Sequence, residues 1–534
     1  MPLVMAVDIG STSIRCCAYA IGGGAPQLVE GSAVQLTMTV PIIAGEVSEI
    51  LKMVDGAVDA CIKKLRQQGL DASTGGIIKG VTIASLAMAL VGVNRKGDPV
   101  THLMSYREGG RGGGAGAASK RLRAEAGHSY PSMYQRTGAP CLHPAYAPAQ
   151  LLQLSTDEPE VMQQVASWQT LASLAIASWC GRKTCPISYS EASWMGLLDV
   201  RELQWDKPLL QLLTVLGCHA GDMLPELTDY DEWDGQLCQQ CSIRWPELKD
   251  AKFFLGVGDG ACATIGSCSP ASTDVAVTCG TSAAARVIVQ AEPSTGGTGG
   301  AGGGSACGTL AEGGHALPLV LRGLWCYRID RRRLLVGGAL TDGGSVYSWA
   351  NKLCGSSSSS SSGGVPVDEM PGSHGLTVLP FFSGERSPGW AEGATGVIQG
   401  LTLDTTLQEI VQAGAEAVAM RLAAVLEILD EAGLLQPQAR VVASGAALRA
   451  SKAWRQVLSN CVNRCVVLAG ETEATSMGAA RLAMEYFLPA KFEMPRVGGS
   501  LLSPDPSAVA VYRERRERQE ELYTLLNSRS CFDF

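Results

Sequence analysis

Two short segments about 270 residues apart share one pattern, and this repeat restricts the folds open to the chain. In each segment an apolar, strand-like run ends at a glycine, hydroxyl residues follow, and a second apolar run contains an arginine. The segments are residues 7–15 (VDIGSTSIR) and 277–287 (VTCGTSAAARV). Such a repeat indicates two similarly built halves in the 534-residue chain.

The rest of the sequence predicts an α/β protein, because short apolar runs alternate with helical periods. The clearest helix covers residues 407–432, with Gly414 on its apolar face, where another segment can pack closely. Residues 512–526 carry four arginines and predict a solvent-exposed C-terminal helix. Three tracts rich in glycine or serine predict flexible surface insertions: 109–116, 295–308 and 356–362.

The composition excludes several classes of protein. A hydrophobic content of 46% supplies two full cores, which argues against a disordered chain. A net charge of −8 lacks the positive footprint of a protein that binds nucleic acid or an acidic membrane. The apolar window at 80–93 is too short to span a bilayer. Because the chain starts directly with an apolar strand, we expect no leader and a cytoplasmic location.

The 18 cysteines are scattered along the chain, and a reducing compartment would keep them as thiols. Cys238 and Cys241 form a C-x-x-C motif without a second pair at ligand spacing. A structural role is therefore the favoured interpretation. A zinc- or redox-regulated protein is the alternative.

Each glycine–hydroxyl turn can direct backbone N–H groups and hydroxyls at one point, which suits phosphate oxygens. Two such turns predict a nucleotide clamped between two domains, with Asp8 placed to hold Mg²⁺ beside the phosphates. Ordinary hairpin turns are the alternative. The sequence has no Walker A loop, which argues against a P-loop kinase. The phosphate-binding candidates are Gly10, Ser11, Thr12, Ser13, Gly280, Thr281 and Ser282.

Asp259 lies between the turns, in a glycine-rich stretch at 256–260 (GVGDG) that follows an apolar run. One interpretation makes it the N-cap of a helix. The other makes it a general base, because phosphoryl transfer chiefly requires an aligned hydroxyl, a metal ion and charge stabilisation.

The order of these motifs resembles the FGGY family of carbohydrate kinases. The motifs are Asp8-x-Gly10-Ser11-Thr12, Gly258-Asp259-Gly260, Gly280-Thr281-Ser282 and Ser444-Gly445-Ala446-Ala447. Longer strings at 190–193 (SEAS), 196–201 (GLLDVR), 337–344 (GGALTDGG) and 379–388 (LPFFSGERSP) are similar to the family as well. The resemblance covers residues 3 to 485, interrupted by the glycine and serine tracts.

The resemblance implies two actin-like, ribonuclease-H-like ATPase domains with the active site in the cleft between them. Asp259 would take the proton of the acceptor hydroxyl as its oxygen attacks the γ-phosphoryl group of ATP. Asp8 would serve Mg²⁺, the two turns would hold the phosphates, and Gly445 and Ala446 would lie against adenosine. We expect an N-terminal domain at 1–255, a C-terminal domain at 256–490 and a tail with a charged helix at 491–534.

Within the family, residues 137–146 (TGAPCLHPAY) and 385–390 (ERSPGW) are most similar to gluconokinases. This implies phosphorylation of gluconate to 6-phosphogluconate. A gluconate pocket needs a cation or several N–H donors for the carboxylate. The candidate sugar ligands are Glu108, Arg111, His143, Asp259 and Arg386. Two of them have a structural alternative. His143 can be a hydrogen-bonded structural histidine, and Arg386 can pair with its neighbour Glu385.

Three departures from the family pattern bear on specificity. Residues 106–111 (YREGGR) stand where the family usually has W-x-D-x-R in its sugar site. Met88 falls where relatives often place a polar sugar ligand, and Ala446 replaces a glycine of the adenosine loop.

Two alternatives to a gluconokinase therefore stay open. One is a ketopentose or polyol kinase acting on xylulose, ribulose or glycerol, and the other is an ATP-binding sensor with a degenerate sugar site. In the favoured interpretation we expect ATP and Mg²⁺ as cofactors and a small-molecule sugar or sugar acid as partner. We expect neither nucleic acid nor membrane as a partner, and a homodimer is compatible with the sequence.

Overall fold

The computed structural model describes residues 2–22, 24–38, 41–70, 78–106, 114–268, 274–291, 320–353, 367–368, 370–391, 393–470, 473–489 and 499–527. The tracts at 295–308 and 356–362 lie outside these residues, as does most of 109–116. Ala115 and Gly116 begin helix α2 (Ala115–Ala126), so the insertion predicted at 109–116 extends two residues too far.

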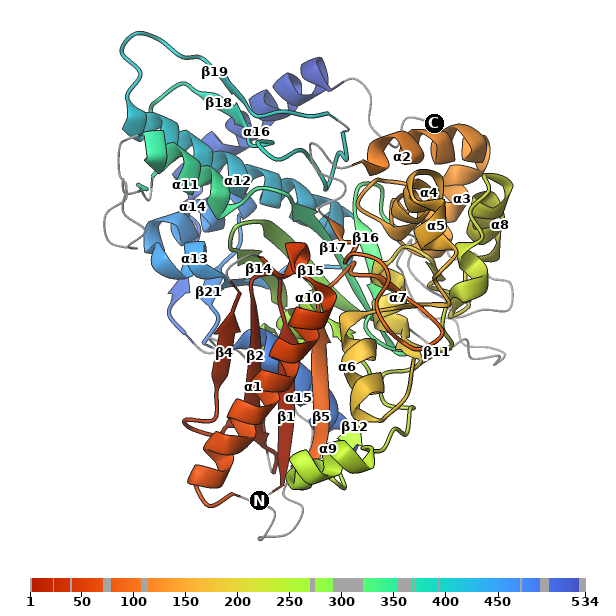
Figure 1. The fold of residues 1–534 in the computed structure, drawn as a ribbon. Helices are drawn as coiled ribbons and strands as arrows, with labels where there is room; N and C mark the ends of the chain where they lie inside the picture. The colour runs from red at the N-terminus through yellow and green to blue at the C-terminus, as the bar shows by residue number, and fades with distance from the viewer. Residues whose placement is uncertain are drawn as a thin grey trace, which may run out of the picture.

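Two seven-stranded sheets frame the molecule, and each contains the same central unit (Figure 1). In the first sheet β1 pairs antiparallel with β2 and parallel with β5. In the second sheet β14 pairs antiparallel with β15 and parallel with β20. The two similarly built halves are therefore confirmed. The bounds are β1 (Leu3–Ile9), β2 (Ser13–Ala20), β5 (Ile78–Ser85), β14 (Asp274–Cys279), β15 (Ala283–Gln290) and β20 (Arg440–Ser444).

The outer strands are shorter on average and complete the two sheets. The first sheet adds β3 (Gln27–Leu28), β4 (Val34–Thr37), β12 (Lys252–Phe253) and β13 (Val257–Gly258). The second adds β16 (Trp325–Arg328), β17 (Arg333–Leu340), β21 (Val466–Leu468) and β22 (Leu501–Leu502). Four small two-stranded sheets are formed by β6 (Val91–Val93), β7 (Ser167–Gln169), β8 (Ile187–Ser188), β9 (Leu198–Asp199), β10 (Gln204–Trp205), β11 (Leu227–Thr228), β18 (Thr377–Leu379) and β19 (Val397–Gln399).

Two helices lie between the sheets and cross at glycines. Helix α10 (Asp259–Ser267) contacts β5 and β15, whereas α15 (Ala474–Phe487) contacts β1, β2 and β5. A Cβ on Gly266 would lie 1.8 Å from the Ala474 carbonyl oxygen, and one on Gly478 would lie 1.8 Å from the Cys262 carbonyl oxygen. The absence of side chains at these two positions lets the helix backbones touch.

The outer helices cover the sheets with one apolar face each. In α1 (Val47–Gln67) the buried residues include Ile50, Val54 and Val58, at helical spacing. Helix α12 (Leu407–Glu431) begins at a capping box formed by Thr406 and Glu409. The helix predicted at 407–432 and its close packing are confirmed, since a Cβ on Gly414 would lie 3.1 Å from Val346 Cγ1 of α11 (Gly344–Leu353).

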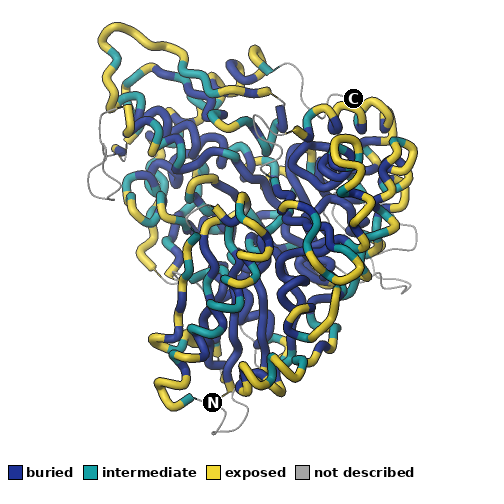
Figure 2. The backbone as a smooth tube through the Cα atoms, viewed as in Figure 1, coloured by how far each residue is buried: buried dark blue, intermediate teal, exposed yellow. Residues whose placement is uncertain are grey.

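The remaining helices fall into three groups. One group lies beyond β16, away from the first sheet, and contains α2, α3 (Tyr130–Thr137), α4 (Ala147–Asp157), α5 (Pro159–Met162) and α8 (Lys207–Val215) (Figure 1). Helices α6 (Leu171–Trp179) and α9 (Gln239–Arg244) lie beside the first sheet, and α7 (Tyr189–Trp194) contacts strands of both sheets, β13 and β16. With the second sheet lie α13 (Ala446–Ala450), α14 (Lys452–Val462) and α16 (Pro506–Leu526). The buried backbone runs through both sheets and the helices between them (Figure 2). Among the described residues, no helix has the length and apolar character needed to cross a membrane.

Helix α16 departs from its prediction as a solvent-exposed helix. Tyr512 and Tyr523 on one face are buried, and Tyr523 Oη donates a hydrogen bond to Glu385 Oε2 at 2.7 Å. Arg515 pairs with the buried Glu416 of α12 at 2.5 Å. Only the opposite face is solvated, because α16 closes the apolar side of α12 and β18.

Candidate active site

The two glycine–hydroxyl turns lie at equivalent places in the two sheets. The first joins β1 to β2, and the Gly10 N–H donates to the Ser13 carbonyl at 3.1 Å. The second joins β14 to β15, and the Gly280 N–H donates to the Ser282 carbonyl at 2.9 Å. Ser13 is buried. The other hydroxyl residues of the two turns are exposed or half-exposed, namely Ser11, Thr12, Thr281 and Ser282. Both tips therefore present small polar groups that a phosphate can approach.

The second turn is buttressed by two neighbouring loops. The Gly343 and Gly344 N–H groups, at the start of α11, donate to the carbonyls of Thr281 at 2.9 Å and Gly280 at 2.7 Å. Gly445, just before α13, has a φ of +88°, and a Cβ there would lie 2.4 Å from the Cys279 carbonyl oxygen. Only glycine fits at residue 445. Ala446, the substituted position, is the first residue of α13 and adds its methyl group beside this contact.

Asp8 is a buried carboxylate on β1, next to the first turn. Burial raises its pKa to about 7, against the lowering effect of Arg15, and Asp259 raises it further. Arg15 Nη1 lies 3.3 Å from Asp8 Oδ2, and Arg15 also reaches Glu473 of the segment before α15 at 3.8 Å. A cation beside Asp8 would favour its charged form, and a single carboxylate with phosphate oxygens is a usual Mg²⁺ environment.

Asp259 is the first residue of α10, and Gly258 is the N-cap, so the N-cap interpretation of Asp259 is wrong. Its Oδ1 accepts a hydrogen bond from the Gly260 N–H at 2.7 Å. Burial raises the pKa of Asp259, and the charge of Arg286 opposes that effect. Because the charge of Asp259 raises the pKa of Asp8, the predicted base lies within electrostatic reach of the predicted metal ligand.

Sequence analysis did not single out Arg286 as a functional residue. It lies on β15 opposite Ala276, and its Nη1 donates to Thr278 Oγ1 at 3.4 Å. Its Nε is buried without a hydrogen-bond partner among the described residues. The signal was present, since the repeat itself places an arginine in each second strand, Arg15 and Arg286.

Arg386 does not pair with its neighbour Glu385. That carboxylate instead binds Arg421 of α12 at 2.7 Å, with both side chains buried. Arg386 Nη2 donates to the Leu340 carbonyl at 3.0 Å, and its Nε is buried without a partner among the described residues. Burial lowers its pKa, opposed by Tyr106, Tyr146 and Tyr327. The alternative in which Arg386 pairs with Glu385 is therefore wrong.

His143 lies near Arg386 but is not a cation. Burial lowers its pKa to about 3, with Arg123 and Arg386 acting in the same direction. Its Nδ1 accepts from the Ala145 N–H at 3.2 Å, which leaves the proton on Nε2. His143 is thus available as a neutral N–H donor, and its ring meets Trp390 edge to face at 5.1 Å.

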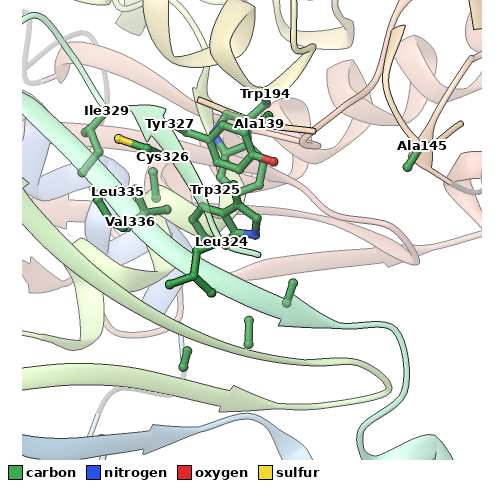
Figure 3. Packing of buried hydrophobic residues seen from close by; sticks show 14 of the residues in the cluster. Ala139, Ala145, Trp194, Leu324, Trp325, Cys326, Tyr327, Ile329, Leu335 and Val336 are labelled. Carbon is green, nitrogen blue, oxygen red and sulfur yellow. The ribbon is translucent and has the colours of Figure 1, made fainter. Parts of the chain in front are cut away.

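Aromatic side chains form one wall between the halves (Figure 3). Trp194 of α7 stacks on Tyr327 of β16 at 4.1 Å, and Tyr327 stacks on Trp325 at 4.7 Å. The Tyr146 and Tyr327 hydroxyls are 2.6 Å apart. Trp194 Nε1 is buried without a partner among the described residues.

A small hollow opens beside this wall. Its lining includes Ser85, Met88, Glu191, Trp194 and Gly258, so it adjoins Asp259. Met88 has a φ of +60°, a left-handed conformation that costs a non-glycine residue free energy. Glu108 and Arg111, the other predicted sugar ligands, lie outside the described residues.

Comparison with known proteins identifies the family. The N-terminal domain model of the FGGY family of carbohydrate kinases matches residues 3–266, and its C-terminal domain model matches residues 275–485. The chain belongs to the FGGY family of carbohydrate kinases. It is a carbohydrate kinase with the two-domain α/β fold of this family, and the family resemblance found in the sequence is confirmed. FGGY kinases use ATP, typically with Mg²⁺.

The relatives act on several substrates. The gluconokinase of Bacillus licheniformis is 23% identical over 495 residues, covering 90% of this chain and 87% of that protein. The glycerol kinase of Acidovorax sp. strain JS42 is 26% identical over 498 residues, covering 90% of each. The gluconate kinase structure from Lactobacillus acidophilus has a TM-score of 0.76 at 21% identity and covers 99% of both chains. The xylulose kinase structure from Rhodospirillum rubrum has a TM-score of 0.77 at 18% identity, covering 98% of this chain and 99% of that one.

Proposed function

We propose that this FGGY kinase phosphorylates a sugar acid, with gluconate giving 6-phosphogluconate, and that Asp259 is the general base. The observation that carries the proposal is Arg386, whose guanidinium has no carboxylate partner among the described residues. Keeping a guanidinium desolvated and unpaired is costly, so such a group indicates a site for an anion. The substrate carboxylate would supply that anion.

The acceptor hydroxyl would lie at Asp259, at the opposite end of the sugar from Arg386. Electrostatic coupling links Arg286 to both Asp259 and Arg386, which supports a single cleft holding both ends of the substrate. Asp259 would accept the hydroxyl proton as the oxygen attacks the γ-phosphoryl group. His143 would donate from Nε2 to a sugar oxygen or to the carboxylate.

The nucleotide would be held by the two turns. Gly10, Ser11, Thr12 and Ser13 would bind phosphate from the first domain, and Gly280, Thr281 and Ser282 from the second. Gly445 and Ala446 would border adenosine, and Asp8 would hold Mg²⁺. When bound, Mg²⁺ would neutralise part of the negative charge of the phosphates. Domains at 1–255 and 256–490 and a cytoplasmic location are part of the same proposal.

The test is ADP release with Mg-ATP and a panel of gluconate, xylulose, ribulose, glycerol and glucitol, the uncharged polyol matched to gluconate. We expect the highest kcat/KM for gluconate, and the Asp259→Asn variant to abolish turnover. Arg386→Met should raise the KM for gluconate about 10- to 100-fold, the range of a hydrogen bond to a charged group, and leave glucitol unchanged. Arg332→Met, at an exposed arginine, is the matched control.

Two outcomes would replace the proposal. A higher kcat/KM for xylulose, ribulose or glycerol would make the protein a ketopentose or polyol kinase. Met88 in the lining of the hollow instead favours the second alternative, an ATP-binding sensor with a degenerate sugar site. ATP binding without turnover of any acceptor would favour the sensor.

A further inference from the structure

Three of the four half-exposed thiols among the described residues gather at one place on the surface. They are Cys180, Cys238 and Cys241, whereas the fourth, Cys465, lies in the C-terminal half. The other described cysteines are buried. The cluster lies at helix α9, beside β12 at the end of the first sheet that is remote from the second sheet (Figure 1).

Cys238 and Cys241 are arranged to react with each other. Cys238 immediately precedes α9, and Cys241 lies one turn further along the chain. The Cys241 N–H donates to Cys238 Sγ at 3.5 Å, which holds that sulfur over the first turn of α9. A disulfide needs two cysteines whose side chains converge. Cys238 is the N-cap and Cys241 the third residue of α9, so both side chains belong to the first turn of the helix, and the two thiols interact with each other.

The surroundings make the two thiols unequal. The hydrogen bond from the Cys241 N–H lowers the pKa of Cys238, whereas burial raises the pKa of Cys241 to about 12. Thiolate is the reactive form of cysteine, so Cys238 is the nucleophile of the pair. Cys180 borders the pair, since a Cβ on Gly181 would lie 2.9 Å from Cys238 Cβ, but burial raises its pKa to about 11.

Ion pairs, a hydrogen bond and an aromatic contact hold α9 and the residue after it against α1 and α6. Arg244 pairs with Asp55 at 2.7 Å and with Asp59 at 2.6 Å on α1. Trp245 Nε1 donates to Asp59 Oδ1 at 2.7 Å, and its ring meets Trp179 edge to face. The described residues contain no group of three or more His, Cys, Asp or Glu side chains suited to a metal ion.

We propose that Cys238 and Cys241 form a reversible dithiol–disulfide site for low-molecular-weight disulfides of the glutathione type. The Cys238 thiolate attacks one sulfur of the reagent, and the first glutathione leaves as a thiol after taking up a proton. Cys241 then loses its proton, attacks the Cys238 sulfur of the mixed disulfide and releases the second glutathione. Two protein thiols are oxidised, and one small disulfide is reduced to two thiols. This site does not depend on the identity of the sugar.

The experiment uses the full-length reduced protein, glutathione disulfide as the probe, and peptide mapping by mass spectrometry. We expect loss of two free thiols and a Cys238–Cys241 disulfide, reversed by dithiothreitol. Cys241→Ser should stop at a glutathione mixed disulfide on Cys238, and Cys238→Ser should leave Cys241 unmodified. Cys465 is the internal control, because it is half-exposed and the nearest cysteine along the chain, Cys461, is buried; Cys465 should gain glutathione only.

Two results would overturn the proposal. One is a disulfide that joins Cys238 to Cys180 instead of Cys241. The other is equal labelling of Cys238 and Cys465 with no internal disulfide, which would make Cys238 an ordinary surface thiol. Circular dichroism of both serine variants would exclude misfolding as the cause.

Discussion

The crossing of α10 and α15 gives a quantitative prediction for Gly478→Ala. The new Cβ would lie 1.8 Å from the Cys262 carbonyl oxygen and 2.9 Å from the Gly266 nitrogen. Ordinary packing begins at 3.4 Å, so the two backbones must separate by more than 1 Å. A gap of only about 0.5 to 1 Å already forfeits a quarter to a half of each dispersion contact, so this separation forfeits more.

We therefore expect Gly478→Ala to lower the free energy of unfolding by about 2 to 3 kcal/mol, the upper range for overpacking. The better helix propensity of alanine, worth about 1 kcal/mol, offsets part of a larger loss. For domains of this size the change corresponds to a Tm lower by roughly 4 to 12 °C. Activity should fall as well, because α10 begins with Asp259.

Differential scanning calorimetry on the full chain, together with kcat, provides the assay. Gly116→Ala is the matched control, since that glycine is in a helix with no atom within 4 Å of the new Cβ, and its Tm should stay equal or rise. Equal Tm values for Gly478→Ala and the unmodified protein would refute the close crossing.

Three further predictions concern the cleft and its support. Mg²⁺ affinity should fall about tenfold per pH unit as the pH drops below about 7, because the proton on Asp8 competes with the metal; Asp8→Asn should bind Mg²⁺ weakly without this slope, as measured by calorimetry. Gly445→Ala should raise the KM for ATP at least tenfold and leave the sugar KM unchanged, because a Cβ there meets the Cys279 carbonyl and the φ of +88° is strained. Tyr523→Phe removes a hydrogen bond to the Glu385 carboxylate and should cost about 1.5 kcal/mol of stability, measured by urea unfolding, with a raised gluconate KM at constant kcat.

Local sequence patterns predicted the parts of the molecule that depend on neighbouring residues. The repeated turns gave two equivalent hairpins, because a glycine followed by hydroxyl residues between two apolar runs has few other conformations. The helix at 407–432 followed from its apolar period, and its capping box was seen only in the structure. Asp259 was placed in the cleft through the family motif, and the structure brings it within electrostatic reach of Asp8.

The predictions that were wrong, incomplete or missing concern residues whose partners are distant in the sequence. The arginines of α16 suggested a solvated helix, but its tyrosines and Arg515 meet α12 across about 100 residues of sequence. Arg386 could be assigned to Glu385 or to the cleft until Arg421, 36 residues away, proved to hold that carboxylate. Arg286 was overlooked although the repeat contains it, because its role depends on Asp259, which is 27 residues away in the sequence.

The position of α15 has a consequence for how the protein is made. This helix is encoded near the end of the second family domain, at Ala474–Phe487, yet it covers β1 and β5 of the first sheet. During synthesis, the first sheet leaves the ribosome long before the helix that covers it. The apolar face of the sheet that contacts α15 therefore stays uncovered until nearly the whole chain has been made. The two halves are therefore one folding unit, and a fragment ending near residue 268 would present an uncovered sheet to chaperones or to aggregation.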